Sequence, residues 1–282
     1  MKIHKIETGN FKLDGGAMFG VIPKSIWNKV YPADDNNLCN LSMRCLLFET
    51  DGRKILIDAG IGTKQSEKFF GYYYLNGSAS LDHSLRAINI KYGDITDVLL
   101  THLHFDHCGG AIRKDETGNN VLTFPHATYW VSLSQWEWAI NPNQREKASF
   151  LQENFMLLLE SGKLRFIPEE GPFAQNIDIR LYNGHSEGLI VPFIRYRNRT
   201  LVFMSDLIPT SAHIPESWIC GYDTQPLISI QERKQFLTEA LEKQYVLFFE
   251  HDINTECCTV KSTEKGIRAD QCFRFADFTE LA

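Results

Sequence analysis

The chain has 282 residues, of which 43% are hydrophobic and 23% charged, as expected of a globular protein that buries a large core. Its 29 Lys and Arg residues against 35 Asp and Glu residues give a formal net charge of -6. This balance argues against nucleic-acid and anionic-membrane partners, because both favour a basic face. No membrane-length apolar run or signal peptide is visible, and the seven cysteines show no paired framework, so we expect a reduced cytoplasmic protein.

Strands interrupted by helices are the predicted organisation of the chain. No repeat, low-complexity tract or Pro/Gly/Ser-rich linker divides it, so we expect a single domain over residues 1–282. Hydrophobic periodicity predicts a hairpin of strands 42–50 and 54–58 around Asp51-Gly52. In chain order there follow a helix at 81–90, a short strand at 95–101, helices at 133–140 and 147–159, strands at 177–182, 189–195 and 200–204, a helix at 230–242 and a strand at 245–249.

Polar clusters terminate the predicted strands. They share histidine and carboxylate side chains, and they are Asp58-Ala-Gly60, Thr101-His-Leu-His104, Gly184-His185, Ser205-Asp206 and Glu250-His251. Positions where rigid strands give way to loops are a common location for catalytic groups. A shared metal centre would explain why the clusters carry the same residue types.

The densest cluster is His102-Leu-His104-Phe-Asp106-His107. In an extended segment residues i and i+2 point to one side, so His102 and His104 can bind one ion together. Asp106 and His107 follow where the chain turns, and can face a neighbouring ion. A lone His-x-His pair is often a surface or core feature, but four ligand-type residues within six positions are hard to explain by packing. The set suits zinc, or other transition metals such as iron, cobalt or manganese.

This string, followed by Gly109-Gly110, resembles the His-x-His-x-Asp-His signature of the metallo-β-lactamase superfamily. Further motif positions of that family are matched in order along the chain, from about Leu46 to Asp252. They are the early Asp-Ala-Gly at Asp58, the Gly-His-Ser-x-Gly element at Gly184-His185-Ser-Glu-Gly188, the strand-end carboxylate in Met204-Ser-Asp206, and the final histidine in Glu250-His251-Asp252.

The resemblance implies an α/β fold, the four-layer αββα sandwich of that superfamily, with two zinc ions. The first ion would be bound by His102, His104 and His185. The second would be bound by Asp106, His107 and His251, and the carboxylate of Asp206 would bridge the two ions. The carboxylate of Asp58 would orient a ligating histidine from outside the ligand set. Taken singly, Asp206 is equally well a helix cap and His185 a turn residue; the set as a whole makes them ligands.

Metal-assisted hydrolysis is the chemistry that this ligand set predicts. Two ions about 3.5–4 Å apart lower the pKa of a shared water toward about 7, which provides hydroxide at neutral pH. Asp106 or Asp206 would carry a proton to the leaving group.

The nature of the cleaved bond is narrowed by further resemblances. The histidine string and the Glu250-His251-Asp252 ending are most similar to N-acyl homoserine lactonases, the quorum-quenching type. The segment Leu13–Pro23 resembles one in a lactonase subgroup that includes methyl parathion type hydrolases. Its Met18 and Phe19 would form an apolar wall over the metals, and the aromatic run 69–75 is expected in a loop nearby. Core or interface packing is the more common role of such aromatics.

One departure from the lactonase pattern concerns the substrate carbonyl. Many acyl homoserine lactonases have a tyrosine a few residues after the bridging aspartate, but the segment after Asp206 contains none up to His213. Thr210 or His213 are the candidates to replace it, although His213 is equally well a surface histidine.

Three alternatives stay open at this point: an organophosphate triesterase, a glyoxalase II-like thioesterase, and a non-catalytic metal-binding sensor. The thioesterase is disfavoured because no C-terminal basic glutathione-binding region is identifiable. The complete ligand set disfavours the sensor and also the flavodiiron branch. The expected partners are a small-molecule substrate and, since family members often dimerise, a second copy of the chain; nucleic acid and membrane are not expected.

Overall fold

The computed structural model describes residues 1–281 and divides the chain into two compact units. Unit 1 comprises Met1–Phe11 and Ser42–Glu169, and unit 2 comprises Lys12–Leu41 and the chain from Glu170 onward. The prediction of one domain stays a prediction. Within the described residues, no helix combines the length and apolar character needed to cross a bilayer.

The sheet of unit 1 has six strands in the order β1-β2-β3-β4-β7-β8, and β1 and β2 continue into unit 2. The strands are β1 (Lys2–Asp14), β2 (Leu38–Thr50), β3 (Arg53–Ile57), β4 (Asp97–Leu99), β7 (Thr128–Ser132) and β8 (Leu164–Ile167). β2 and β3 form the predicted antiparallel hairpin, whereas β3, β4, β7 and β8 run parallel. A short hairpin of β5 (Ile112–Lys114) and β6 (Asn120–Leu122) accompanies this sheet.

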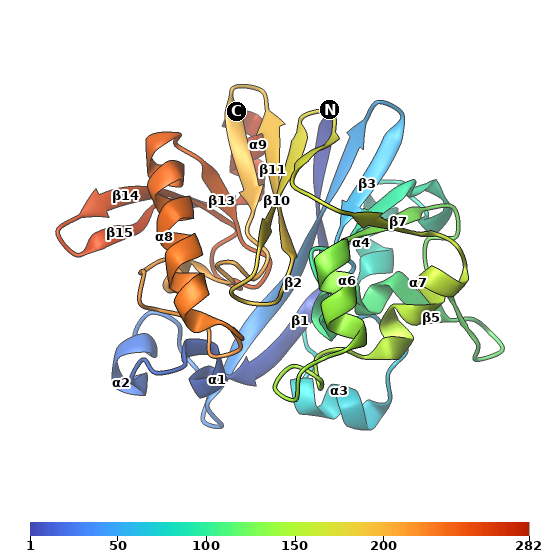
Figure 1. Ribbon diagram of the computed structural model, residues 1–282, viewed down its shortest axis with the longest axis horizontal. Coiled ribbons are helices and arrows are strands. Elements are labelled where there is room, and N and C mark those ends of the chain that lie inside the picture. Colours follow the sequence, from blue (N-terminus) through green and yellow to red (C-terminus); the bar gives the residue numbers. More distant parts are fainter. Residues whose placement is uncertain (282) are drawn as a thin grey trace. The chain divides into compact units, whose positions relative to one another are not determined.

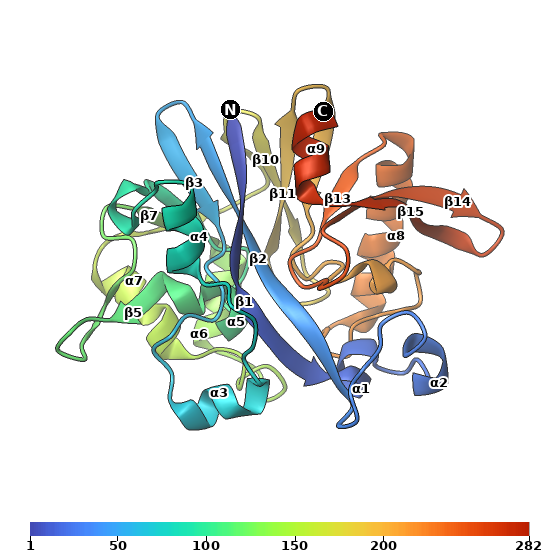
Figure 2. The same cartoon turned by 180° about the vertical axis from the view of Figure 1, so that it is seen from behind.

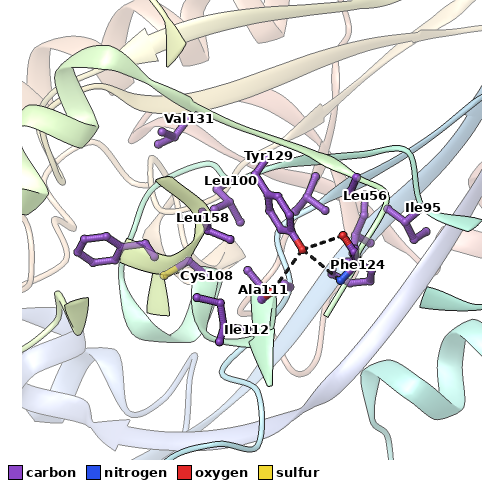
Figure 3. Packing of buried hydrophobic residues seen from close by; sticks show 14 of the residues in the cluster. Leu56, Ile95, Leu100, Cys108, Ala111, Ile112, Phe124, Tyr129, Val131 and Leu158 are labelled. Atoms are coloured by element: carbon purple, nitrogen blue, oxygen red, sulfur yellow. Dashed lines mark hydrogen bonds between the residues drawn. The ribbon is translucent and has the colours of Figure 1, made fainter. Parts of the chain in front are cut away.

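The helices of unit 1 are α3 (Glu67–Tyr73), α4 (Leu81–Ala87), α5 (Phe105–Cys108), α6 (Leu133–Ile140) and α7 (Met156–Glu160). All of them except α3 bury apolar residues in the core of this unit, so that Leu158 of α7 shares a core with Leu56 and Val131 of the strands (Figure 3). The hydroxyl of Tyr129 enters this core and bonds the backbone of Phe124 and the carbonyl of Ala111. A buried phenol needs such partners, because an unpaired hydroxyl costs free energy.

Unit 2 is built on a seven-stranded sheet in the order β15-β14-β13-β12-β11-β10-β9. Its strands are β9 (Gly171–Ala174), β10 (Ile177–Tyr182), β11 (Leu189–Tyr196), β12 (Arg199–Phe203), β13 (Val246–Phe248), β14 (Cys257–Thr263) and β15 (Gly266–Phe273). β12 and β13 are parallel, and the other neighbours are antiparallel. The parallel pair requires a crossover, which carries α8 (Pro226–Glu242).

Helices α8 and α9 (Phe275–Leu281) lie on opposite faces of this sheet, as comparison of Figure 1 with Figure 2 shows. Successive residues of β13 point to opposite faces, which explains how one strand serves both helices. Leu247 packs in the core with Phe236 of α8, whereas the ring of Phe248 lies 5.6 Å from that of Phe275 in α9. The short helices α1 (Gly15–Phe19) and α2 (Lys24–Trp27) also belong to unit 2.

Most strands predicted from periodicity are confirmed, but two segments were predicted wrongly. The helix expected at 147–159 is replaced by turns, a 3-10 turn at Gln152–Asn154 and α7. The reason is that the carbonyl of Ser149 accepts a hydrogen bond from Phe105 N instead of continuing a helix. The aromatic run 69–75, expected in a loop, lies largely in α3, which is capped by Ser66 and stabilised by ring contact between Phe69 and Tyr73.

Candidate metal centre

The ends of parallel strands β3 and β4 place the first group of polar side chains in unit 1. Ile57 and Leu99 are register partners, so the residues that follow them emerge at the same edge of the sheet. Asp58 has a φ of 58°, a conformation that non-glycine residues adopt at some energetic cost and that is frequent at functional sites. Its carboxylate, fully buried, accepts hydrogen bonds from the backbone N and the hydroxyl of Thr101 at 2.7 and 2.6 Å.

His102 and His104 face one another through specific ring nitrogens. The hydroxyl of Thr101 donates to Asp58, so it can only accept from His102 Nδ1 at 3.1 Å, which assigns the proton of His102 to Nδ1. His104 Nε2 lies 2.9 Å from Glu146 Oε1, and a carboxylate only accepts, so the proton of His104 is on Nε2. The two nitrogens left with lone pairs, His102 Nε2 and His104 Nδ1, are 2.9 Å apart.

Asp106 and His107 lie in the one-turn helix α5 and are buried. His107 Nδ1 is 3.1 Å from Asp58 Oδ2, which again must accept, so the lone pair of His107 is on Nε2. That nitrogen is 3.8 Å from Asp106 Oδ2. Asp58 therefore contacts a histidine of the motif, and its role in orienting a metal ligand stays a prediction.

Unit 2 repeats the same construction at the ends of its parallel strands. Phe203 of β12 and Phe248 of β13 are register partners, and the chain leaves them toward Asp206 and His251. Ser205, between strand and ligand candidate, has a φ of 44°. Both sheets thus use a residue of positive φ to direct the chain after a parallel strand into a cluster of polar side chains.

Asp206 faces two histidines, one with each carboxylate oxygen. Oδ2 is 3.1 Å from His185 Nε2, and Oδ1 is 3.2 Å from His251 Nε2. The other nitrogen of His185, Nδ1, is 2.9 Å from Asp223 Oδ1. Burial by itself would lower the pKa of His185, but the carboxylates of Asp206 and Asp223 outweigh it and raise this pKa to about 10.

The donor chemistry within each unit fits a metal ion. When imidazoles are neutral, lone pairs face lone pairs or carboxylate oxygens at close range, an arrangement that is repulsive unless a cation lies between them. A shared proton or a divalent ion relieves this repulsion, and nitrogen with carboxylate oxygen is the ligand set that zinc prefers. The facing pairs are His102 with His104, His107 with Asp106, and His185 with Asp206.

Glycine allows close backbone approach beside both clusters. A Cβ on Gly110 would lie 2.1 Å from the carbonyl oxygen of Ala59, next to Asp58. In unit 2, a Cβ on Gly184 would lie 2.3 Å from Ser229 Oγ of α8. At Gly110 and Gly184 a side chain would therefore collide with neighbouring atoms.

The four candidate substrate-binding residues lie together in unit 2. His213 Nε2 donates to the carbonyl of Met18 at 2.9 Å, so Nδ1 accepts from the hydroxyl of Thr210 at 2.7 Å. The ring of Phe19 stacks on His213 with centroids 4.5 Å apart. Burial lowers the pKa of His213 to about 4. His213 is fully buried, so it is not a surface histidine, and its substrate-binding role stays a prediction.

Two carboxylates beside candidate ligands were not identified from the sequence. Glu146 and Asp223 each contact a candidate ligand histidine, yet neither lies in a motif. Glu146 directly precedes the segment expected to be helical, residues 147–159, and Asp223 lies in a segment for which no structure was expected. The only signal in the sequence was their residue type.

Imidazole and carboxylate groups gathered at the ends of parallel strands define a metal-binding enzyme centre. Residues 44–251 match the family described as the Metallo-beta-lactamase superfamily. The chain therefore belongs to that superfamily. It has the metallo-β-lactamase fold, as predicted, with one large sheet and its helices in each unit, and it is a lactonase-like hydrolase.

Its relatives include an N-acyl homoserine lactonase of Bacillus cereus, 24% identical over 78% of this chain and 85% of the relative. A probable metal-dependent hydrolase from Staphylococcus aureus has a similar structure, with a TM-score of 0.86, 34% identity and coverage of 96% of both chains. AidC, described as a dizinc quorum-quenching lactonase in complex with its product, superimposes with a TM-score of 0.79 at 22% identity over 97% of both chains. The last likeness concerns the fold alone.

Proposed function

We propose that the protein is a dinuclear-zinc hydrolase that opens the ring of lactones, with N-acyl homoserine lactones as the substrate class. The lactonase relatives support the substrate class, and the donor chemistry of the two units supports the metal centre. The ligands would be those that the motifs indicate: His102, His104 and His185 for one ion, Asp106, His107 and His251 for the other, and Asp206 for both.

The observation that carries the proposal is the geometry of Asp206. A carboxylate that presents one oxygen to His185 Nε2 and the other to His251 Nε2 has the arrangement of a ligand shared by two ions. Bound zinc supplies a polarised substrate carbonyl and an acidified water.

The chain's own residues would manage protons and orientation. Asp58 accepts from His107 Nδ1 and so keeps Nε2 available as a ligand. Asp106 Oδ2 or an oxygen of Asp206 would take the proton of the attacking water and pass it to the ring oxygen as the C–O bond breaks. The products are then a carboxylate and an alcohol on one molecule. Phe105, beside Asp106, packs with Phe69 and Tyr73 into an aromatic wall suited to an apolar acyl chain.

A substrate panel on protein of measured zinc content tests the proposal. Proton release would be followed with an N-acyl homoserine lactone, an aryl phosphotriester and an acylglutathione thioester. We expect lactone turnover that disappears in the metal-free protein and in Asp206→Asn. Preferred turnover of the phosphotriester or the thioester would instead assign one of the other two enzymes, and zinc binding without turnover would support the sensor.

The proposed partners are the small-molecule substrate and a second copy of the chain. Sedimentation analysis tests the dimer: a mass near 65 kDa is expected, about twice the 32.4 kDa of one chain. A mass of one chain at micromolar concentration would contradict it.

A further inference from the structure

We propose that Glu146 and Asp223 are positioning residues, which fix the ring nitrogen that His104 and His185 each present to a metal ion. This inference rests on the proposed assignment of these histidines as ligands, but not on the identity of the substrate. Neither carboxylate belongs to a motif that the sequence reveals.

Glu146 is held rigidly on the far side of His104. Its side chain is only 3% exposed, and Oε1 is 2.9 Å from His104 Nε2. The second oxygen, Oε2, accepts from Trp138 Nε1 at 2.6 Å and from Asn143 Nδ2 at 3.1 Å. The turn itself is preformed, because Asn143 Oδ1 accepts the backbone N–H of Glu146 at 3.0 Å. The ring of Phe150 packs on His104 at 4.9 Å and limits its rotation.

Asp223 occupies the equivalent place beside His185. It is 3% exposed, and Oδ1 lies 2.9 Å from His185 Nδ1. The following residues bind the segment to the histidine's own backbone: Thr224 donates its N–H and hydroxyl to the carbonyl of His185 at 3.1 and 3.0 Å. Gln225 N donates to the carbonyl of Gly184 at 2.9 Å. The carboxylate and the ring are thus held as one assembly.

The two contacts select opposite nitrogens. Glu146 takes the Nε2 proton of His104 and leaves Nδ1 as the ligand atom, whereas Asp223 takes the Nδ1 proton of His185 and leaves Nε2. The other nitrogen of each ring points at a neighbouring ligand candidate, His102 Nε2 at 2.9 Å and Asp206 Oδ2 at 3.1 Å. A carboxylate behind a ligating imidazole fixes its tautomer and raises its basicity, and loss of such a partner weakens metal binding. Without Glu146 or Asp223, the wrong tautomer would compete.

Zinc affinity, measured by competition with a chromophoric chelator, tests this role in Glu146→Ala and Asp223→Ala. We expect each to bind zinc roughly 10–100-fold more weakly than the wild type. Glu146→Gln and Asp223→Asn keep an acceptor oxygen but lose the charge, so they should lose less. Glu153→Gln and Glu216→Gln, at exposed acids seven positions from each site, are matched controls and should bind like the wild type.

A second readout separates positioning from a merely structural effect. Long-range ¹H–¹⁵N NMR of the zinc-loaded protein should show a proton on Nε2 of His104 and on Nδ1 of His185, shifted downfield by the carboxylate. In the Gln and Asn variants this shift should shrink for the one histidine contacted, while the thermal midpoint of the metal-free protein stays near that of the controls.

The proposal is overturned if the alanine variants bind zinc as tightly as the controls, or if zinc-loaded wild type carries these protons on the opposite nitrogens. If an alanine variant does not fold, the Gln and Asn variants decide by the same two readouts. Failure of the proposed function looks different: zinc-loaded wild type would then leave lactones intact while these affinity differences persist.

Discussion

The two units contain similar polar clusters and use similar backbone conformations to position them, but their sequence patterns differ. In each, a pair of parallel strands ends beside a residue of positive φ, Asp58 in unit 1 and Ser205 in unit 2. In unit 1 the ligand candidates follow within His102–His107, whereas in unit 2 they are spread over His185, Asp206 and His251. A contiguous motif identifies the first cluster immediately, but the second is recognisable only as a set.

The strand-end carboxylates also differ in what they do. Asp58 is surrounded by donors, the N–H and hydroxyl of Thr101 and the Nδ1 proton of His107, and so it limits the orientation of a ligand candidate. Asp206 instead faces Nε2 of two histidines, which makes it a ligand candidate itself. The position at a strand end does not determine the role of a carboxylate; its hydrogen-bonding neighbours do.

The largest expected effect separates these two aspartates. Asp206→Asn should lower kcat/KM for the lactone by more than about 100-fold, because it removes charge from a group that contacts two ligand candidates. Asp58→Asn should cost roughly 10–100-fold, as expected for a partner of a ligand. Steady-state kinetics at equal zinc content measures both. A larger loss for Asp58→Asn would reverse the roles given to them.

Acid sensitivity should be traceable to His213 in unit 2. Its pKa is lowered from 6.5 to about 4 in the folded protein, so the unfolded chain takes up this proton first as pH falls. Stability from keeping His213 neutral is therefore present above pH 6.5 and lost between 6.5 and about 4, by up to roughly 3 kcal/mol. In urea unfolding between pH 8 and 4, the free energy of unfolding of His213→Gln should fall less steeply with decreasing pH than that of the wild type.

The control for this experiment is His126→Gln, at an exposed histidine of unit 1. The free energy of unfolding of this variant should decrease with falling pH as steeply as that of the wild type. Equal slopes for wild type and His213→Gln would show that His213 does not titrate as its burial requires.

A smaller effect is expected when alanine replaces the closely packed glycine beside either cluster. Gly110→Ala and Gly184→Ala should each lower the free energy of unfolding by about 1–3 kcal/mol, because the added Cβ meets Ala59 O or Ser229 Oγ well inside van der Waals contact. Gly71→Ala is the control, since no atom lies within 4 Å of its added Cβ and the site is in helix α3. Chemical denaturation measures all three. A loss of stability in only one of the two variants would show that the two glycines do not have equivalent roles in the two units.

The sequence predicted the parts of this protein that local patterns encode. The β2–β3 hairpin, helix α6 and strand β10 have the periodicity and turn residues of their elements, and the histidine string identifies its own cluster. β1 and the β14–β15 hairpin were missed, because their apolar residues do not alternate regularly with polar ones. The missing helix at 147–159 shows the other limit: its backbone bonds to Phe105, a long-range contact that no local pattern reports.

The site was predictable to the same extent and no further. Motif positions gave the ligand candidates and Asp58, but Glu146 and Asp223 lie 42 and 38 positions from the histidines they contact. Their side chains are ordinary acids in the sequence, and only folding brings each one to a ring nitrogen. The contact of His213 with Met18 likewise spans 195 positions in the chain, whereas Thr210 is a local neighbour.

Zinc stoichiometry measured together with lactone turnover on the same preparation tests the central claim most directly. Metal analysis of the wild type and of Asp206→Asn would be paired with turnover at increasing zinc. The dinuclear account predicts turnover that rises to a maximum at two zinc ions per chain, with fewer ions retained by Asp206→Asn. Full lactone turnover at one ion per chain, or in metal-free protein, would contradict it.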